Sequence, residues 1–511
     1  MRRRRRRSRC RTHKTTTRAR SQRMDDLPLG PGAMIILGLY ALSLIGVGLW
    51  GRLRRAEESL EDHYLAGRSL GLSVLLLTLF ATQYSGNTLF GFTGKAYRIG
   101  FAWLMSVHAM MAMVVGYLVF APRLQRLARK WSLITPGDFL LRRFGSHPLR
   151  ILATLCMIYA LANYTLAQLK VMGHAVTGLS GGRIDPLWGV VVLAVIMVLY
   201  ETLGGMRSVA WTDAVQGLLL FFGFGLLLYL AWTNLGGLPS ATPKIVEQAP
   251  DKVAVPSSSM CVYWLSMVVL VGIGGSVYPQ AIQRIYAAKS GRTLRRSLAF
   301  MSVMPLVTTG AVLLLGLIAI PLYPGLDATR SDQVLALVLR DVMTTGAFGY
   351  WTVVVLLAAV VAALMSTADS ALLSISSMVV RDLYGPYLRK DASEAHLTSV
   401  GKIVSWVVIA LLVWIASLEK LTLVRLLEIK FEVLIQVAPA LYLGTTWKKL
   451  DGRAVLSGMV VGLTIALGLW ALEIKPLGFH PGVAGLAANT LVTVLLGRFS
   501  APSTPLAAAQ R

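Results

Sequence analysis

Charged residues are scarce in this sequence. Asp, Glu, Lys and Arg make up 14% of its 511 residues, whereas 55% are hydrophobic and the mean hydropathy is +0.63. One water-soluble core cannot bury so much apolar surface. The composition therefore excludes an ordinary soluble domain and indicates a bundle embedded in a lipid bilayer.

Cysteine and histidine are also rare, which argues against several classes of enzyme. Cys10, Cys156 and Cys261 are too few for a disulfide framework, and the last two lie in apolar runs where cysteine behaves as a small hydrophobe. The seven histidines are scattered, and no Gly-x4-Gly-Lys phosphate loop is present to power an ATPase. We therefore expect no enzymatic activity, no redox role and no organic cofactor.

Long apolar runs recur almost from end to end. We count about 13 runs of roughly 18 to 25 residues, each enough to cross about 30 Å of hydrocarbon. Because backbone polar groups in lipid must be satisfied within their own segment, these runs predict helices, and the chain is predicted to be an all-α polytopic membrane protein. We expect a basic tail (1–24), a first transmembrane helix and loop (25–69), a five-helix unit (70–234), an outer loop (235–259), a second five-helix unit (260–446), two C-terminal helices (447–500) and a tail (501–511).

Basic residues crowd alternate inter-helix loops. Loops such as 122–150 and 284–296 are rich in Arg and Lys, while the loops between them are poor in both. Since positively charged loops mark the cytoplasmic side, we expect the cell (inner) membrane, an N-terminus outside and a C-terminus in the cytoplasm. The net charge of +26 does not indicate a nucleic-acid partner, because the basic residues form no folded basic domain.

The N-terminal tail conflicts with that orientation. Twelve Arg and Lys residues precede Met24, and such a tail should stay inside. We interpret this as translation beginning at Met24, which leaves an acidic leader; the alternative is a genuine basic extension.

Two apolar runs contain residues that interrupt helices. Run 72–97 contains Gln83-Tyr84-Ser85-Gly86-Asn87-Thr88, and run 260–283 contains Gly274-Gly275-Ser276 followed by Pro279-Gln280. Glycine permits unwinding and proline removes a backbone donor. Each run opens one five-helix unit, as in transporters whose paired inverted repeats bind solute and ions at broken helices. For either run alone, close helix packing by glycine is an equal alternative.

The run 348–380 carries a stripe of hydroxyls, Ser366, Ser370, Ser374 and Ser377, on one helical side. Sodium, a hard cation, takes oxygen ligands, although serine also bonds back to helical carbonyls and joins helices. Asp369 is either a functional group inside the membrane or a residue near the inner helix end. Asp213 lies just inside the start of a helix, where a carboxylate also has a structural role.

Together these segments resemble the sodium:solute symporter family over roughly 33–500. The resemblance is carried by five ordered motifs: Tyr64-Leu65-Ala66-Gly67-Arg68; Ala81-Thr82-Gln83-Tyr84-Ser85-Gly86 with Gly94 to Gly100; Tyr200 to Gly205 with Thr212-Asp213-Ala214-Val215-Gln216; Gln283 to Lys289; and Met365 to Ser370 with Arg381-Asp382-Leu383-Tyr384. It implies 13 helices, a leucine-transporter-type inverted repeat of five plus five helices in helices 2 to 11, an outward N-terminus and alternating access.

The resemblance also implies the site. One sodium ion would lie between the first broken helix and the third helix of the second repeat. Its ligands would be the carbonyls of Ala81, Tyr84 and Ala363 and the hydroxyls of Ser366 and Thr367. Asp213 would match the family's carboxylate near the inner sodium exit. Proline carriers have an aspartate where this chain has Gln83, which weakens a proline assignment.

Solute recognition is expected between the broken helices and run 150–178. The candidate residues are Gln83, Ser85, Asn87, Thr88, Tyr159, Asn163, Tyr164, Gln168, Ser276 and Gln280. No arginine stands out at membrane depth, so the charge of the solute stays open. Arg425, Glu428, Lys430 and Glu432 are interpreted as a salt-bridged helix start.

We therefore predict a sodium-coupled secondary active symporter that imports a small organic solute: pantothenate, an amino acid, a monocarboxylate or a sugar. The alternatives are a proton-coupled symporter of the same fold, a transporter-derived membrane sensor, or a channel. The expected partners are the solute and the lipid bilayer, without nucleic acid, and the oligomeric state stays open.

Overall fold

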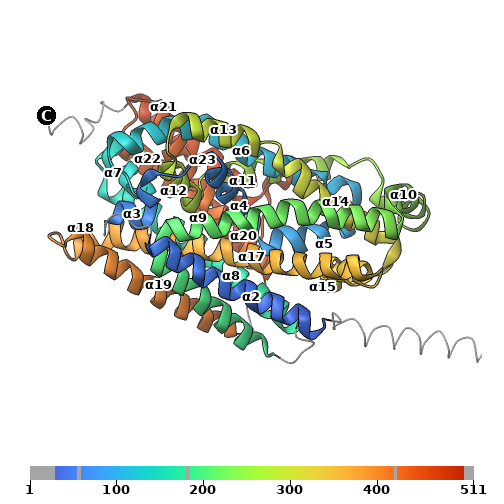
Figure 1. The fold of residues 1–511 in the computed structure, drawn as a ribbon. Helices are drawn as coiled ribbons and strands as arrows, with labels where there is room; N and C mark the ends of the chain where they lie inside the picture. The colour runs from blue at the N-terminus through green and yellow to red at the C-terminus, as the bar shows by residue number, and fades with distance from the viewer. Residues whose placement is uncertain (1–28, 54–58, 180–183, 419–422, 500–511) are drawn as a thin grey trace, which may run out of the picture.

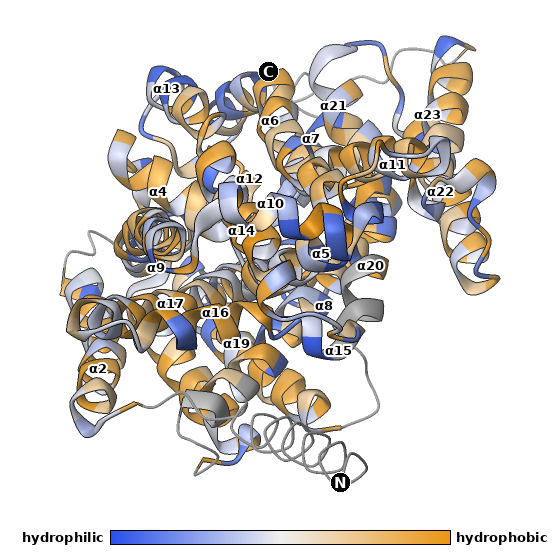
Figure 2. Ribbon diagram, turned by 90° about the vertical axis from the view of Figure 1, so that its right-hand side faces the viewer, coloured by the Kyte–Doolittle hydropathy of each residue, from blue (hydrophilic) through white to orange (hydrophobic). Residues whose placement is uncertain are grey.

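The computed structural model describes residues 29–53, 59–179, 184–418 and 423–499. Every regular element in these ranges is a helix, accompanied by one isolated bridge between Leu70 and Ala288. The helices run lengthwise through an elongated bundle, and hydrophobic residues dominate their ribbons (Figures 1 and 2). The prediction of an all-α chain is confirmed.

The first half of the chain, as far as the expected outer loop, forms the following helices. They are α2 (Pro31–Leu53), α3 (Leu60–Leu65), η1 (Ala66–Arg68), α4 (Leu72–Gln83), η2 (Asn87–Gly91), α5 (Phe92–Ile99), η3 (Gly100–Leu104), α6 (Met105–Lys130), α7 (Pro136–Phe144), α8 (His147–Leu179), α9 (Pro186–Leu235) and α10 (Gly237–Gln248).

The second half continues the bundle to the C-terminal pair. Its elements are η4 (Pro250–Lys252), α11 (Ser258–Ser276), α12 (Pro279–Ala287), α13 (Gly291–Met301), α14 (Met304–Leu322), α15 (Ala328–Ser331), α16 (Val334–Met343), α17 (Ala347–Met378), η5 (Val379–Tyr384), α18 (Gly385–Tyr387), α19 (Glu394–Ser417), α20 (Leu423–Leu434), η6 (Ile435–Val437), α21 (Ala438–Thr446), α22 (Gly452–Ala471), η7 (Pro476–Gly478) and α23 (Pro481–Phe499).

Ten helices of the described ranges are long and apolar enough to cross a membrane. One of them, α9, has 50 residues, or about 75 Å at ~1.5 Å per residue, more than twice the hydrocarbon thickness. Gly205 leaves helical geometry at φ 55° and ψ −148°, so α9 consists of two spans that meet at this residue. The predicted number of 13 helices stays a prediction.

Both predicted helix breaks are present. The first helix, α4, ends at Gln83, and Tyr84 is extended, with φ −96° and ψ 105°. The second, α11, ends at Ser276, and α12 begins at Pro279, whose missing N–H suits a first helical position. The breaks thus lie next to Gly86 and Gly275, as the sequence predicts.

The long helix α17 passes through the centre of the bundle. Every residue from Leu356 to Met378 is buried, and the helix packs against α4, α8, α9 and α12. In contrast, α22 and α23 pack on each other at one edge (Figure 2). Polar side chains of α17 therefore face other helices rather than lipid.

Candidate functional site

The end of α4 faces the hydroxyl-bearing middle of α17. The Thr367 hydroxyl donates to the carbonyl oxygen of Tyr84 at 3.5 Å. Both Ser366 and Thr367 are fully buried, as are Ala81 and Ala363, which lies one turn before Thr367. Carbonyls at an interrupted helix end and nearby hydroxyls are the hard oxygen donors that a small alkali cation prefers.

A chain of hydrogen bonds connects the two breaks through α6. The side-chain amide of Gln83 donates from Nε2 to the Tyr117 hydroxyl at 3.0 Å, and that hydroxyl donates to the Gly275 carbonyl, also at 3.0 Å. The Oε1 atom of Gln83 is buried without a hydrogen-bond partner in the described ranges. Since an unsatisfied buried acceptor is costly, Oε1 is a candidate for binding a solute donor.

Three further predicted solute residues lie at the first break. Gln168 of α8 accepts a hydrogen bond through Oε1 from the backbone N–H of Gly86 at 3.2 Å. The hydroxyls of Ser85 and Thr88 lie 3.4 Å apart. The structure therefore brings these side chains to the unwound segment.

Tyr164 joins the first break to the second. Its ring stacks on that of Tyr278, with centroids 5.4 Å apart and planes 18° from parallel. Its hydroxyl lies beside those of Ser85 and Thr367. One aromatic ring thus contacts a predicted solute residue, a predicted sodium ligand and the second break.

The second break supplies Ser276 and Gln280. The hydroxyl of Ser276 lies 2.6 Å from that of Tyr442 and bonds to the Ile273 carbonyl at 2.7 Å. Both polar atoms of the Gln280 side chain are buried and lack a hydrogen-bond partner in the part of the chain that is described. Gln280 is therefore the more available of the two to bind a solute.

Two predicted solute residues are not part of this cluster, and a third has no described side chain. Tyr159 is 41% exposed, and Asn163 donates to its backbone carbonyl at 2.8 Å, so these two are not brought to the breaks. The side chain of Asn87 lies outside the described residues.

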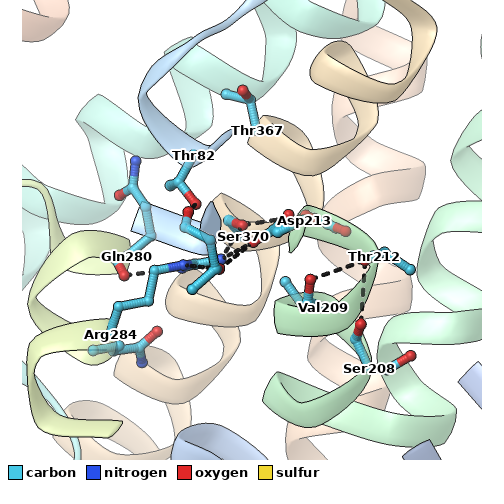
Figure 3. Close-up of polar contacts among 12 residues, drawn as sticks. Thr82, Ser208, Val209, Thr212, Asp213, Gln280, Arg284, Thr367 and Ser370 are labelled. Carbon is cyan, nitrogen blue, oxygen red and sulfur yellow. Dashed lines mark hydrogen bonds and ion pairs between the residues drawn. The ribbon is translucent and has the colours of Figure 1, made fainter. Parts of the chain in front are cut away.

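A buried ion pair adjoins the predicted sodium ligands. Arg284 on α12 points toward Asp213 on α9 and Ser370 on α17 (Figure 3). Its Nη2 atom lies 2.7 Å from Oδ2 of Asp213, and both side chains are fully buried. The guanidinium also donates to Thr78, Ser370 and the Gln280 carbonyl, at 2.7, 2.5 and 3.0 Å.

This pair corrects the expectation that no arginine lies at membrane depth. The sequence places Arg284 at the start of a basic inner loop, but α12 continues through the core as far as Ala287, and all its residues are buried. The other Asp213 oxygen, Oδ1, has no hydrogen-bond partner within the described ranges, and the Ser366 hydroxyl faces the carboxylate.

Asp369 is also in the core. Its carboxylate accepts hydrogen bonds from the Tyr200 hydroxyl and, at 3.3 Å, from the Ser370 hydroxyl, and it is fully buried. The interpretation that it lies near water at an inner helix end is therefore wrong.

The serine stripe of α17 has two parts. Ser366 and Ser370 face Asp213 and Arg284, whereas Ser374 donates to Oε1 of Gln283 and Ser377 accepts from its Nε2, both at 2.5 Å. Ser374 and Ser377 therefore join α17 to α12, which is the helix-joining role that serines can have in a membrane bundle.

Within the charged segment of α20, Lys430 does not form part of a salt-bridged helix start. Lys430 is 3% exposed and lies over the ring of Tyr164, with Nζ 3.6 Å from the centroid. Glu432 accepts a hydrogen bond from the backbone N–H of Gly482. The side chains of Arg425 and Glu428 lie outside the described residues.

Comparison with known proteins decides the family. The model of the sodium:solute symporter family matches residues 63–462. The chain belongs to the sodium:solute symporter family. The sodium/pantothenate symporter of Escherichia coli (strain K12) is 28% identical over 473 residues, which cover 90% of this chain and 95% of that protein. The osmoregulated proline transporter of Bacillus subtilis (strain 168) is 27% identical, covering 91% of this chain and 94% of the relative.

Solved structures show the fold of this sodium:solute symporter. A sodium-coupled sialic acid symporter in a substrate-bound outward-open state aligns over 93% of this chain and 99% of its own, with a TM-score of 0.79 and 19% identity. Mhp1, a nucleobase-cation-symport-1 family transporter, aligns over 88% of this chain and 97% of its own, with a TM-score of 0.51 and 17% identity. The chain therefore has the leucine-transporter fold.

Family membership and fold together establish the class of activity. The chain is a multi-pass membrane protein and belongs to a family of sodium-coupled symporters of small solutes.

The sequence reasoning about this symporter missed several residues of the cluster. Tyr117, Tyr200 and Tyr442 each donate or share a hydrogen bond at the core, with Gly275, Asp369 and Ser276, respectively. Single tyrosines within apolar runs were the available signal, since a buried hydroxyl usually needs a partner.

Proposed function

We propose that this chain imports a small organic solute with sodium by alternating access, and that Na⁺ binds between the end of α4 and the middle of α17. The proposed ligands are the carbonyls of Ala81, Tyr84 and Ala363 and the hydroxyls of Ser366 and Thr367. The observation that carries this proposal is the Thr367 hydroxyl, which lies 3.5 Å from the carbonyl oxygen where α4 stops. An interrupted helix beside hydroxyls suits a dehydrated cation.

The proposed solute pocket lies between the two breaks and α8. It comprises Gln83, Ser85, Thr88, Tyr164, Gln168, Ser276 and Gln280, without Tyr159 and Asn163. The unpartnered amide atoms of Gln83 and Gln280 support it, because buried polar groups ordinarily bind something. Pantothenate, amino acids, monocarboxylates and sugars are the candidate solutes, and Gln83 argues against proline among them.

We further propose that Asp213 lies on the inner exit route of sodium. The Ser366 hydroxyl faces both this carboxylate and the proposed ion position, so a departing cation passes from one to the other. Arg284, which pairs with Asp213, then keeps the carboxylate from holding the ion permanently.

The proposed orientation follows from the two ends of the bundle. Figure 1 shows α3, α7 and α18 at one end and α10 and α15 at the other. Arg142 and Arg143 on α7, with Arg389 and Lys390 after α18, make the first end strongly basic. Basic ends remain in the cytoplasm, so we place α7 inside, in the inner membrane.

Both chain ends are assigned by this rule. The start of α2 lies at the opposite end, where the Gly30 N–H bonds to Tyr350 near the start of α17. Gly497, near the end of α23, lies against Trp447, the residue that follows α21. The carbonyl oxygens of Gly444 and Trp447 accept hydrogen bonds from Arg143 on α7. The proposed N-terminus is therefore outside and the C-terminus cytoplasmic.

The test removes the two proposed hydroxyl ligands. In proteoliposomes, Ser366→Ala with Thr367→Ala should raise the sodium concentration for half-maximal uptake by roughly tenfold or more, as the loss of ligand-sphere groups typically does. The matched control is Ser374→Ala with Ser377→Ala, which removes two hydroxyls of the same stripe that face Gln283 instead. An unchanged sodium dependence in the first double variant would remove the proposed site.

Proton coupling is the alternative, and Asp369 favours it. This buried carboxylate bonds to Tyr200 and Ser370 and forms no ion pair with a described residue, so it is able to carry a proton. Uptake measured with choline in place of sodium at fixed pH separates the two: full uptake in choline, abolished by Asp369→Asn, selects proton coupling.

A further inference from the structure

A lysine lies buried beside the proposed solute pocket. Lys430 on α20 is 3% exposed, and its Nζ atom lies 3.6 Å from the centroid of the Tyr164 ring, 4.8 Å from that of Phe431 and 5.9 Å from that of Tyr278. Ionisable residues inside a membrane bundle are costly and usually functional.

No carboxylate neutralises this ammonium in the part of the chain that the structure describes. The six ion pairs of that part do not include Lys430. Glu432 lies two positions further along α20, on a different face, and binds the Gly482 N–H. Aromatic rings attract an ammonium, but they carry no net charge to balance it.

The ammonium is next to both halves of the proposed machinery. Tyr164 presents its ring face to Lys430, while its hydroxyl lies beside Ser85 and Thr367. Tyr278, stacked on Tyr164, belongs to the second break. One ring therefore separates Lys430 from a proposed solute residue and a proposed sodium ligand.

We propose that Lys430 binds a carboxylate of the solute, and that the imported molecule is a net anion. This inference rests on the proposed function and names its substrate class. The ammonium is a compact charge with three donors, suited to a carboxylate oxygen. Its neighbours Tyr164 and Tyr278 offer aromatic faces for the apolar body of the same solute.

The charges of the site select an anion over a zwitterion. With Na⁺ bound, protonation of Lys430 gives the pocket two positive charges, one on the ion and one on the ammonium. A carboxylate with no cationic group of its own lowers this to one, whereas a zwitterion leaves it at two. The anion and Na⁺ also attract each other, so each strengthens binding of the other, which is the linkage that symport requires.

The test compares solutes that differ only in this charge. Purified full-length protein is titrated in sodium with three carboxylate and alcohol pairs of matched skeleton: pantothenate and pantothenol, lactate and propane-1,2-diol, and glucuronate and glucose. Proline serves as the zwitterion. The thermal unfolding midpoint reports binding, because a ligand that binds the folded state stabilises it.

We expect a carboxylate to bind about tenfold or more tightly than its alcohol, since truncating a buried charge pair has effects of at least this size. Lys430→Met should abolish that difference, and Lys430→Arg should retain most of it. Replacing a merely structural lysine would not remove the difference between a carboxylate and its alcohol.

Lys170→Met is the matched control. Lys170 is on α8, as Tyr164 is, but bonds to the Leu418 carbonyl at the edge of the bundle, and its loss should leave the preference for carboxylates unchanged. The proposal is overturned if alcohols, glucose or proline bind as tightly as the carboxylates, or if Lys430→Met keeps the preference for carboxylates. If Lys430→Met does not fold, the pairs measured on the wild-type protein decide alone. Failure of the proposed function appears separately, as binding that is independent of sodium.

Discussion

Replacing Arg284 by Met would leave the Asp213 carboxylate buried without its cation. The pair lies 2.7 Å apart with both side chains fully buried, and the guanidinium also binds Thr78 and Ser370. Breaking a buried pair by removing one partner typically destabilises by about 3–5 kcal/mol, because a charge remains in a low-dielectric interior. We expect Arg284→Met to lower the free energy of unfolding by about that amount.

The second charge can be removed as well. Asp213→Asn alone leaves a buried guanidinium and should also be strongly destabilising. The double variant removes both charges, and its loss should be smaller than the sum of the two single losses by about 2 kcal/mol or more. Such a positive coupling is the signature of two charges that neutralise each other in the core.

The assay is equilibrium unfolding of the detergent-solubilised protein with increasing sodium dodecyl sulfate, followed by tryptophan fluorescence. The control is the pair Arg330–Asp327, 4.0 Å apart and 59% and 67% exposed, for which Arg330→Met should change the free energy by at most ~0.5 kcal/mol. If Arg284→Met costs no more than this control, or if the two single losses simply add, the reasoning is refuted.

Two further predictions concern the backbone conformation at Gly205 and the dependence of folding stability on pH. Gly205→Ala should destabilise by about 1–3 kcal/mol, because Gly205 has φ 55° and a Cβ there would lie 2.4 Å from the His63 carbonyl oxygen; Gly225→Ala on the same helix, with nothing within 4 Å of its Cβ, should be neutral in the same unfolding assay. His480 precedes α23, and burial lowers its pKa from 6.5 to about 4, so the neutral form is favoured on folding. As pH falls from 6.5 toward 4 the unfolded chain takes up a proton that the folded chain does not, and stability should fall by up to about 3 kcal/mol. His480→Gln should flatten this profile of unfolding free energy against pH, and an equally steep profile in the variant would contradict the assignment.

Much of the fold is readable from the sequence because it depends on local chemistry. Apolar runs must be helical in lipid wherever they pack, and glycine or proline weakens a helix wherever it lies. The breaks beside Gly86 and Gly275 were therefore predictable. The turn at Gly205 was also signalled, by a Gly-Gly pair between two apolar runs.

The candidate site was predictable only in part. Ser366 belongs to a stripe of serines that is visible along the chain, whereas Thr367 was proposed only through the resemblance to the symporter family. Arg284 was missed because a loop boundary drawn from hydropathy placed it in water, whereas α12 carries it into the core. Lys430 was read as part of a charged helix start, although the faces of Tyr164 and Phe431 cover it.

The sequence by itself determined that the chain is helical, crosses a membrane many times, and interrupts two helices at defined residues. Those properties follow from interactions between each segment and lipid or its own backbone. Only the tertiary structure decided where the buried charged residues lie: Arg284 beside Asp213, and Lys430 over the ring of Tyr164. These partners lie 71 and 266 positions apart in the sequence. The periodicity within one helix shows which residues share a face of that helix, but it does not show which distant helix that face contacts.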